Sequence, residues 1–163
     1  MPKKQKDPDP IKTVARNRRA LAKFAILESL EAGMVLTGPE VKSLRGGKVN
    51  MQEGFVRLEK DEAFLWNVHI NPYAQGSLHV EQVPTRTRKL LLKRSEISRL
   101  IGKTTTKGLT LVPLEMYFNK KGKAKVKIGL ARGKKAPDRR EDIKKRELNR
   151  EMRREFGEKQ RVK

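Results

Sequence analysis

The chain has 163 residues, which suits one folded domain with tails better than two domains. Its 40 Lys and Arg residues against 19 Asp and Glu residues give a formal net charge of +21. Such an excess repels itself unless a polyanion neutralises it, so we expect a nucleic-acid partner. No apolar stretch is long enough to span a bilayer and no export signal is visible, so we expect a cytoplasmic protein that is not bound to a membrane. Without cysteine, disulfides, thiol catalysis and cysteine-type zinc sites are excluded.

Composition divides the chain into three regions. We expect a basic N-terminal arm over residues 1–22, a folded core over residues 23–132 and a basic C-terminal tail over residues 133–163. The core holds nearly all aromatic and β-branched residues, whereas the tail has 13 Lys and Arg residues against 7 Asp and Glu residues. We expect arm and tail to be unstructured when free, because neither buries enough apolar surface to offset chain entropy.

Most of the core has the patterns of β-strands. Apolar residues alternate from Phe24 to Leu36, with a break at Glu28. Residues 55–58 and 63–68 flank Lys60-Asp61-Glu62, which predicts a hairpin. A strand over residues 110–118 contains Pro113, which favours an edge or a bulge. The clearest strand runs from Lys123 to Leu130, with Ala124, Val126, Ile128 and Leu130 on one face and three lysines on the other.

Two short helices interrupt these strands. Thr37 and Glu40 form a capping box for a helix that ends at Gly46-Gly47. A second helix is expected from Arg94 to about Ile101, ended by Gly102. Several short strands with inserted helices predict a mainly β fold, a small closed antiparallel barrel.

Signatures of enzymes are absent from the sequence, and we expect no catalytic residue, cofactor or metal. Gly102-Lys103-Thr104 has the end of a phosphate-binding loop, but the required earlier glycine is replaced by Ile97, so a helix end and a turn explain it. The two histidines, His69 and His79, lie ten residues apart in predicted strand and loop, where a structural role is more common.

Clusters of basic residues are candidates for contact with RNA phosphates. Lys123, Lys125 and Lys127 share one face of a strand, where they either contact phosphate or protect a sheet edge. Two further clusters favour RNA: Arg16, Arg18 and Arg19, and Arg86, Arg88, Lys89, Lys93 and Arg94. Aromatic residues are scarce, which favours recognition of a folded RNA by shape and backbone over base stacking along single strands.

Several separated segments resemble one known family. They are Glu31–Gly33, Thr37–Asn50, Pro84–Leu92, Val126–Lys135 and Asp138–Arg140. Together they resemble the small protein B family, which binds tmRNA (SsrA) in bacterial trans-translation, over essentially residues 14–147. The resemblance implies an oligonucleotide-binding barrel with three helices that binds the elbow of the tRNA-like domain of tmRNA, near its D-loop, and takes the place of the missing anticodon arm.

The resemblance also implies which residues contact RNA. The family's RNA face maps onto Asn17, Arg18, Glu31, Leu91 and Lys125, and the expected set further includes Arg45, Arg86, Arg88, Lys89 and Lys127. Glu31 repels phosphate but can accept hydrogen bonds from a guanine edge or an exocyclic amine; the alternative is a local ion pair with an arginine. For Leu91 the alternative, packing in the core, is favoured.

The family's tail enters the empty mRNA channel of a stalled 70S ribosome, beyond the decoding centre, and becomes helical there. That role maps onto Gly133 to about Arg154, with the expected contacts Gly133, Lys134, Lys135, Asp138, Arg139, Arg140, Ile143, Lys144, Lys145 and Arg146. Leu148, Met152 and Phe156 would align on one helix face. Some family members carry an aromatic residue or His where this chain has Pro137, which instead favours a helix start near Asp138.

Three hypotheses stay open on composition alone: a tmRNA carrier, a ribosomal protein and an RNA-modifying enzyme or nuclease. The Gly38–Asn50 and Thr85–Leu92 segments favour the first by resemblance. Elongation factor Tu and alanyl-tRNA synthetase would then be indirect partners.

Overall fold

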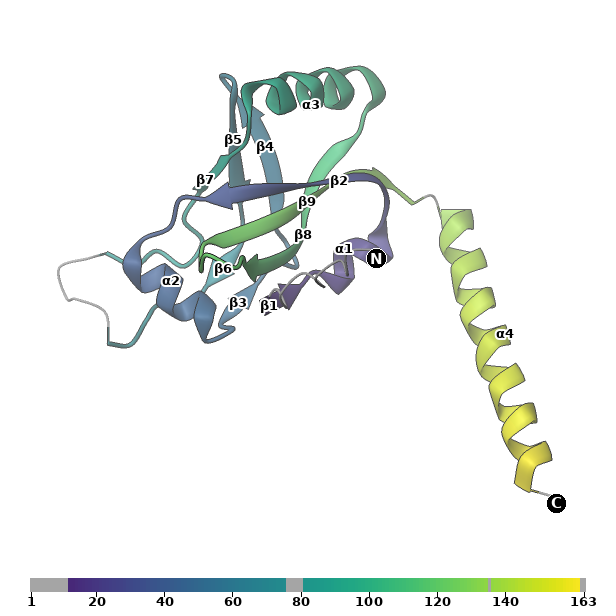
Figure 1. The fold of residues 1–163 in the computed structure, drawn as a ribbon. Helices are drawn as coiled ribbons and strands as arrows, with labels where there is room; N and C mark the ends of the chain where they lie inside the picture. Colours follow the sequence, from purple (N-terminus) through teal and green to yellow (C-terminus); the bar gives the residue numbers. More distant parts are fainter. Residues whose placement is uncertain (1–11, 76–80, 135, 162–163) are drawn as a thin grey trace, which may run out of the picture. The chain divides into compact units, whose positions relative to one another are not determined.

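The computed structural model describes residues 12–75, 81–134 and 136–161, without the side chains of residues 106–107, 136–142 and 158–161. The chain divides after Arg132 into two units, which are described separately. Figure 1 shows the elements, which in chain order are β1 (Lys12–Arg16), α1 (Arg18–Lys23), β2 (Phe24–Met34), α2 (Gly38–Arg45), β3 (Val49–Asn50), β4 (Phe55–Glu59), β5 (Glu62–Trp66), β6 (His69–Ile70), β7 (Arg88–Leu91), α3 (Arg94–Lys107), β8 (Thr110–Phe118), β9 (Ala124–Gly133) and α4 (Ala136–Arg161).

The main sheet closes on itself through β8. Its strand order is β1-β8-β4-β5-β7-β2-β9, and β8 also pairs with β9, so six strands form a circuit of pairings. Every pairing whose register is described is antiparallel. The inward side chains of this circuit form the main core, which includes Val56, Ala63, Leu65, Leu90, Leu111, Met116, Val126, Ile128 and Leu130. The mainly β prediction is therefore confirmed.

A bulge in β8 confirms the prediction made from Pro113. The register between β8 and β9 shifts between Pro113 and Glu115. One extra residue moves every later side chain to the other face of a strand. Val112 and Leu114 consequently pack outside the circuit against Ala20 of α1, while Met116 turns inward. The bulge thus creates a small apolar surface on which α1 packs.

The other strand predictions hold with small changes of boundary. Lys60 and Asp61 form the turn of the β4–β5 hairpin with φ of 47° and 61°, and Glu62 already belongs to β5. Glu28 breaks the alternation of β2 because its carboxylate pairs with Arg99 and, at 2.6 Å, with the Nζ of Lys103 on α3.

Two predictions are wrong. The second helix does not end at Gly102: α3 continues to Lys107 and ends at Gly108, whose φ of 61° suits glycine. An interior glycine costs only about 1 kcal/mol, and the Lys103–Glu28 ion pair and the buried Leu100 hold the helix on both sides of it. The predicted unstructured arm is structured from residue 12 onward, because β1 pairs with β8 and α1 packs on the bulge.

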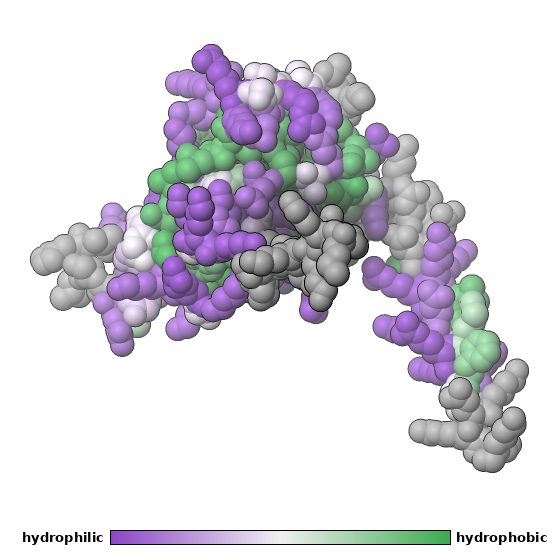
Figure 2. Space-filling model, viewed as in Figure 1, coloured by the Kyte–Doolittle hydropathy of each residue, from purple (hydrophilic) through white to green (hydrophobic). Residues whose placement is uncertain are grey.

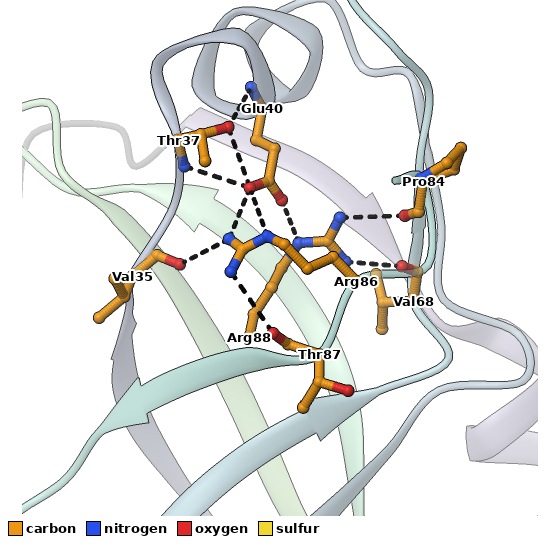
Figure 3. A network of polar contacts seen from close by, with 8 residues as sticks. All are labelled: Val35, Thr37, Glu40, Val68, Pro84, Arg86, Thr87 and Arg88. Atoms are coloured by element: carbon orange, nitrogen blue, oxygen red, sulfur yellow. Dashed lines mark hydrogen bonds and ion pairs between the residues drawn. The ribbon is translucent and has the colours of Figure 1, made fainter. Parts of the chain in front are cut away.

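A buried ion pair ties α2 to the start of β7 (Figure 3). The capping box is confirmed: Glu40 Oε1 accepts from the Thr37 amide at 3.2 Å, and the Glu40 amide donates to the Thr37 hydroxyl. The same carboxylate accepts from Arg88, which has no exposed surface, and from Arg86 at 2.6 Å. Burial by itself raises the pKa of the Glu40 carboxyl, but the hydrogen bonds from Arg88 and Arg86 outweigh it and hold the pKa below its usual value.

The two guanidinium groups also bind backbone carbonyls from distant segments. Arg88 donates to the carbonyls of Val68 at 2.8 Å and Pro84 at 3.0 Å, and Arg86 donates to that of Val35 at 3.3 Å. The network therefore fixes α2, the end of β2 and the segment before β7 with respect to one another (Figure 3).

The second unit begins at Gly133 and contains the helix α4, in which Pro137 is the second residue. Leu148, Met152 and Phe156 are exposed and recur every four residues, and Figure 2 shows apolar side chains gathered along one side of this helix. Disorder of the tail in the free protein stays a prediction.

Replacing Glu40 by Gln is expected to destabilise the fold by about 3–5 kcal/mol, because Arg88 keeps a buried charge without a counter-ion. The free energy of unfolding in urea measures this. Glu59→Gln, which removes the exposed carboxylate 3.6 Å from Arg57, is the matched control and should cost at most about 1 kcal/mol.

The loss of folding stability at acidic pH should also differ between the native chain and Glu40→Gln. The pKa of Glu40 is depressed in the folded chain, so its stabilisation is present above the usual carboxylate range and is lost as pH falls through the depressed value. Glu40→Gln should therefore lose less stability on acidification than the native chain. Equal losses, or a cost no larger than that of Glu59→Gln, would contradict the assigned role.

Candidate nucleic-acid interface

The outer faces of β2, β9 and β8 bring Glu31, Lys125 and Tyr117 together. Tyr117 of β8 pairs directly with Lys125 of β9, and two residues along, Glu115 pairs with Lys127. The bulge at Pro113 sets this register, and the alternation of β9 places Lys125 and Lys127 outside while Val126 and Ile128 fill the core. Cationic side chains from one strand thus lie beside a carboxylate from its neighbour.

Glu31 is held by one partner and approached by another. The Tyr117 hydroxyl donates to Glu31 Oε2, and Lys125 Nζ lies 3.9 Å from Glu31 Oε1. The Glu31 side chain is still 52% exposed. Burial, and then the hydrogen bond to the Glu31 carboxylate, raise the pKa of the Tyr117 hydroxyl well above its usual value. The local ion pair considered for Glu31 exists, but with a lysine instead of an arginine.

Two hollows flank this group of residues. The first is a pocket of about 360 Å³ lined by Thr13, Ser29, Leu30, Glu31, Glu115, Tyr117 and Lys127. The second is a groove of about 310 Å³ lined by Gly33, Met34, Leu36, Val41, Leu91, Gly122, Lys123, Ala124 and Lys125. The first is rich in polar side chains and the second has an apolar floor with two lysines on it. A ligand lying across Glu31 and Lys125 would meet both.

Leu91 belongs to the groove and not to the core, so the favoured alternative of core packing is wrong. Leu91 is 55% exposed and pairs across β7 and β2 with Gly33. A Cβ on Gly33 would lie 3.3 Å from the Leu91 Cβ and 3.6 Å from Lys125 Nζ. The missing side chain of Gly33 thus lets Leu91 and Lys125 converge over the backbone of β2.

Three other predicted contacts lie at the surface near or beyond this face. Arg45 of α2 stacks over the Phe118 ring at 4.7 Å and reaches the Gly122 carbonyl at 3.5 Å, at the rim of the groove. Lys89 is exposed on the same face of β7 as Leu91, with its Nζ 2.9 Å from Glu62. Arg18 is exposed on α1.

The remaining predicted contacts of the core have internal partners. Asn17 is only 2% exposed: its side chain caps α1 through the Ala20 amide and donates to the carbonyls of Met51 and Pro113, both at 2.9 Å. Arg86 and Arg88 hold the Glu40 network, and in this conformation Arg88 offers no surface to a phosphate. These residues shape the interface from within.

Of the predicted ribosome contacts, Ile143, Lys144, Lys145 and Arg146 are exposed on α4. Gly133 ends β9 and Lys134 follows it. Asp138, Arg139 and Arg140 belong to the helical backbone of α4, and Lys135 lies outside the described residues.

Sequence reasoning missed Tyr117 and Gly33. Tyr117 lies 86 residues from Glu31, so no local spacing signals their contact. Gly33 lies inside a segment that carries the family resemblance. Its role becomes visible only in the pairing of β2 with β7, which places it opposite Leu91.

The fold and this face define a class: a small mainly β protein with a mixed but predominantly basic outer surface suited to a polyanion. Among the described residues no group of three side chains could hold a metal ion. Within the same part of the chain, no helix has the length and apolar character needed to cross a membrane.

Comparisons with known proteins give the family. The model of the SmpB protein family matches residues 14–158. The chain is 51% identical over 141 residues to an SsrA-binding protein of Enterococcus faecalis, covering 86% of this chain and 90% of that one. It is 54% identical over 143 residues to an SsrA-binding protein of Acaryochloris marina, covering 88% and 92%.

A solved structure is similar to this chain in sequence and in fold. A chain of "tmRNA-SmpB: a journey to the center of the bacterial ribosome" has 50% sequence identity and a TM-score of 0.65, covering 82% of this chain and 94% of that one. This chain therefore belongs to the SmpB protein family.

Proposed function

We propose that this chain binds tmRNA and delivers it to stalled ribosomes for trans-translation, without catalysing a reaction. The observation that carries the proposal is identity of about 50% over most of the chain with proteins named for binding SsrA. The similar solved structure is named for tmRNA, SmpB and the bacterial ribosome. The ribosomal-protein and enzyme hypotheses have no comparable support.

The outer face of β2, β9 and β8 would bind the elbow of the tRNA-like domain, near its D-loop. Lys127 supplies charge for phosphates, Lys125 and Glu31 offer a hydrogen-bond donor beside an acceptor, and Leu91 supplies apolar contact. Folded RNA is recognised by such a mixture of shape, backbone and a few base contacts.

The closed circuit of strand pairings supports an oligonucleotide-binding type of barrel as the scaffold of this face. Residues 133–163 would be disordered in the free protein and helical in the mRNA channel beyond the decoding centre. The reason is electrostatic: the exposed arginines of α4 repel one another in water, and a channel walled by ribosomal RNA removes that repulsion.

The cellular setting follows from this role. The chain would act in the cytoplasm, where ribosomes translate. Elongation factor Tu and alanyl-tRNA synthetase would meet the complex through tmRNA and not through this chain.

The salt dependence of tmRNA binding tests the phosphate contacts. Lys127→Gln should reduce the slope of log K against log salt by about 0.7–0.9, because it removes one released counter-ion. The matched control is Arg57→Gln, since the Arg57 guanidinium lies over Trp66 on β5, the strand farthest from β9 around the circuit. An unchanged slope for Lys127→Gln, or an equal change for Arg57→Gln, would refute the placement of RNA on this face.

Proline substitutions in α4 test the tail. Ile143→Pro and Leu148→Pro should abolish tagging on ribosomes stalled on truncated mRNA but leave tmRNA affinity intact, because proline removes a helical hydrogen bond and costs about 3 kcal/mol. Leu148→Ala removes the same side chain and keeps the helical backbone, so it is the control for the proline effect. Normal tagging by the proline variants would mean that the tail works as an extended strand.

A further inference from the structure

The ion pair between Glu31 and Lys125 is close but open. Its atoms, Glu31 Oε1 and Lys125 Nζ, are 3.9 Å apart, longer than the about 2.7–2.9 Å of a charge-assisted hydrogen bond. Both side chains lie on adjacent strands, and Glu31 is half exposed. No direct hydrogen bond closes the pair in this structure.

Tyr117 restrains the Glu31 carboxylate. Its hydroxyl donates to Glu31 Oε2, the oxygen that does not face Lys125. The Tyr117 side chain is itself fixed, because it is only 7% exposed and β8 is paired on one side with β1 and on the other with β9. A rigid donor therefore anchors one carboxylate oxygen and leaves the other with free acceptor capacity.

We propose that Tyr117 is a positioning residue: it holds the Glu31 carboxylate so that Glu31 and Lys125 together bind the edge of one unpaired guanine. The inference rests on the proposed function. The carboxylate accepts from the N1 and N2 hydrogens of guanine, and the ammonium group donates to O6. Phosphate does not fit, because Glu31 repels it.

The side chains around Glu31 and Lys125 can also pack against the ring of a base. Leu91 and Lys125 converge over Gly33, so an apolar side chain stands beside the charged pair. Unpaired bases in folded RNA are bound in this way, by edge hydrogen bonds combined with packing of the ring. Adenine also has an acceptor beside a donor, but it offers the carboxylate one amino group where guanine offers two N–H groups.

A double-mutant cycle tests the proposal with full-length chain and tmRNA. Tyr117→Phe and Glu31→Gln should each weaken tmRNA binding roughly tenfold, as expected for a lost hydrogen bond to a charged group. The double variant should be no weaker than either single variant, and the salt slope should stay unchanged in all three. Tyr73→Phe, which removes the other tyrosine hydroxyl of the chain, is the matched control and should bind normally.

Losses that multiply in the double variant, or native binding by Tyr117→Phe, would overturn the proposal. Inosine in place of each unpaired guanine supplies a second arm. At one position inosine should weaken binding to the native chain and not to Glu31→Gln; equal effects on both proteins at every position would also overturn it. Absence of tmRNA binding by the native chain would instead contradict the proposed function.

A spectroscopic readout separates positioning from a merely structural role. In a Tyr73→Phe background the tyrosinate absorbance reports Tyr117 alone. Because the Glu31 carboxylate helps to raise the pKa of the Tyr117 hydroxyl, Glu31→Gln should move the onset of ionisation to lower pH. An unmoved onset would mean that the two groups do not meet in solution, and the proposal would be wrong.

Discussion

The direction of Arg88 decides how β7 presents its side chains. A guanidinium with no exposed surface must keep its counter-ion, and Glu40 provides it from the first turn of α2. Because side chains alternate along a strand, an inward Arg88 sends Lys89 and Leu91 to the outer face. Leu91 then meets Gly33 of β2. The apolar half of the proposed RNA interface thus depends on an ion pair that is itself buried.

The bulge of β8 decides which polar side chains of that strand reach the proposed RNA interface. It returns Met116 to the core, and Tyr117 therefore reaches the outer face beside Lys125. There its hydroxyl meets Glu31 across β9. Asn17 supports the same region, since its side-chain amide binds the Pro113 carbonyl at the bulge. Two local irregularities, one buried charge and one bulge, therefore bring the side chains of three strands to one place.

Local signals in the sequence were sufficient for much of this architecture. Period-two alternation predicted β2 and β9, the Thr37–Glu40 capping box predicted α2, and Pro113 predicted an edge or a bulge, of which the bulge is present, because each pattern lies within a few residues. The roles of individual residues depend on distant partners. Arg88 looks like one more member of a basic cluster until Glu40, 48 residues away, folds against it. Leu91 looks like a core residue until the inward direction of Arg88 is known. Gly102 looks like a helix end, because its neighbours' contacts to β2 are invisible in the sequence.

The central claim is that the outer face of β2, β9 and β8 holds tmRNA. The most direct measurement places a photo-crosslinking amino acid at position 127 or, as the control, at position 57, and sequences the RNA captured in cells. The account predicts that position 127 captures mainly tmRNA, at its tRNA-like domain, and that position 57 captures far less of it. Capture of ribosomal RNA alone from position 127, or equal capture of tmRNA from both positions, would contradict it.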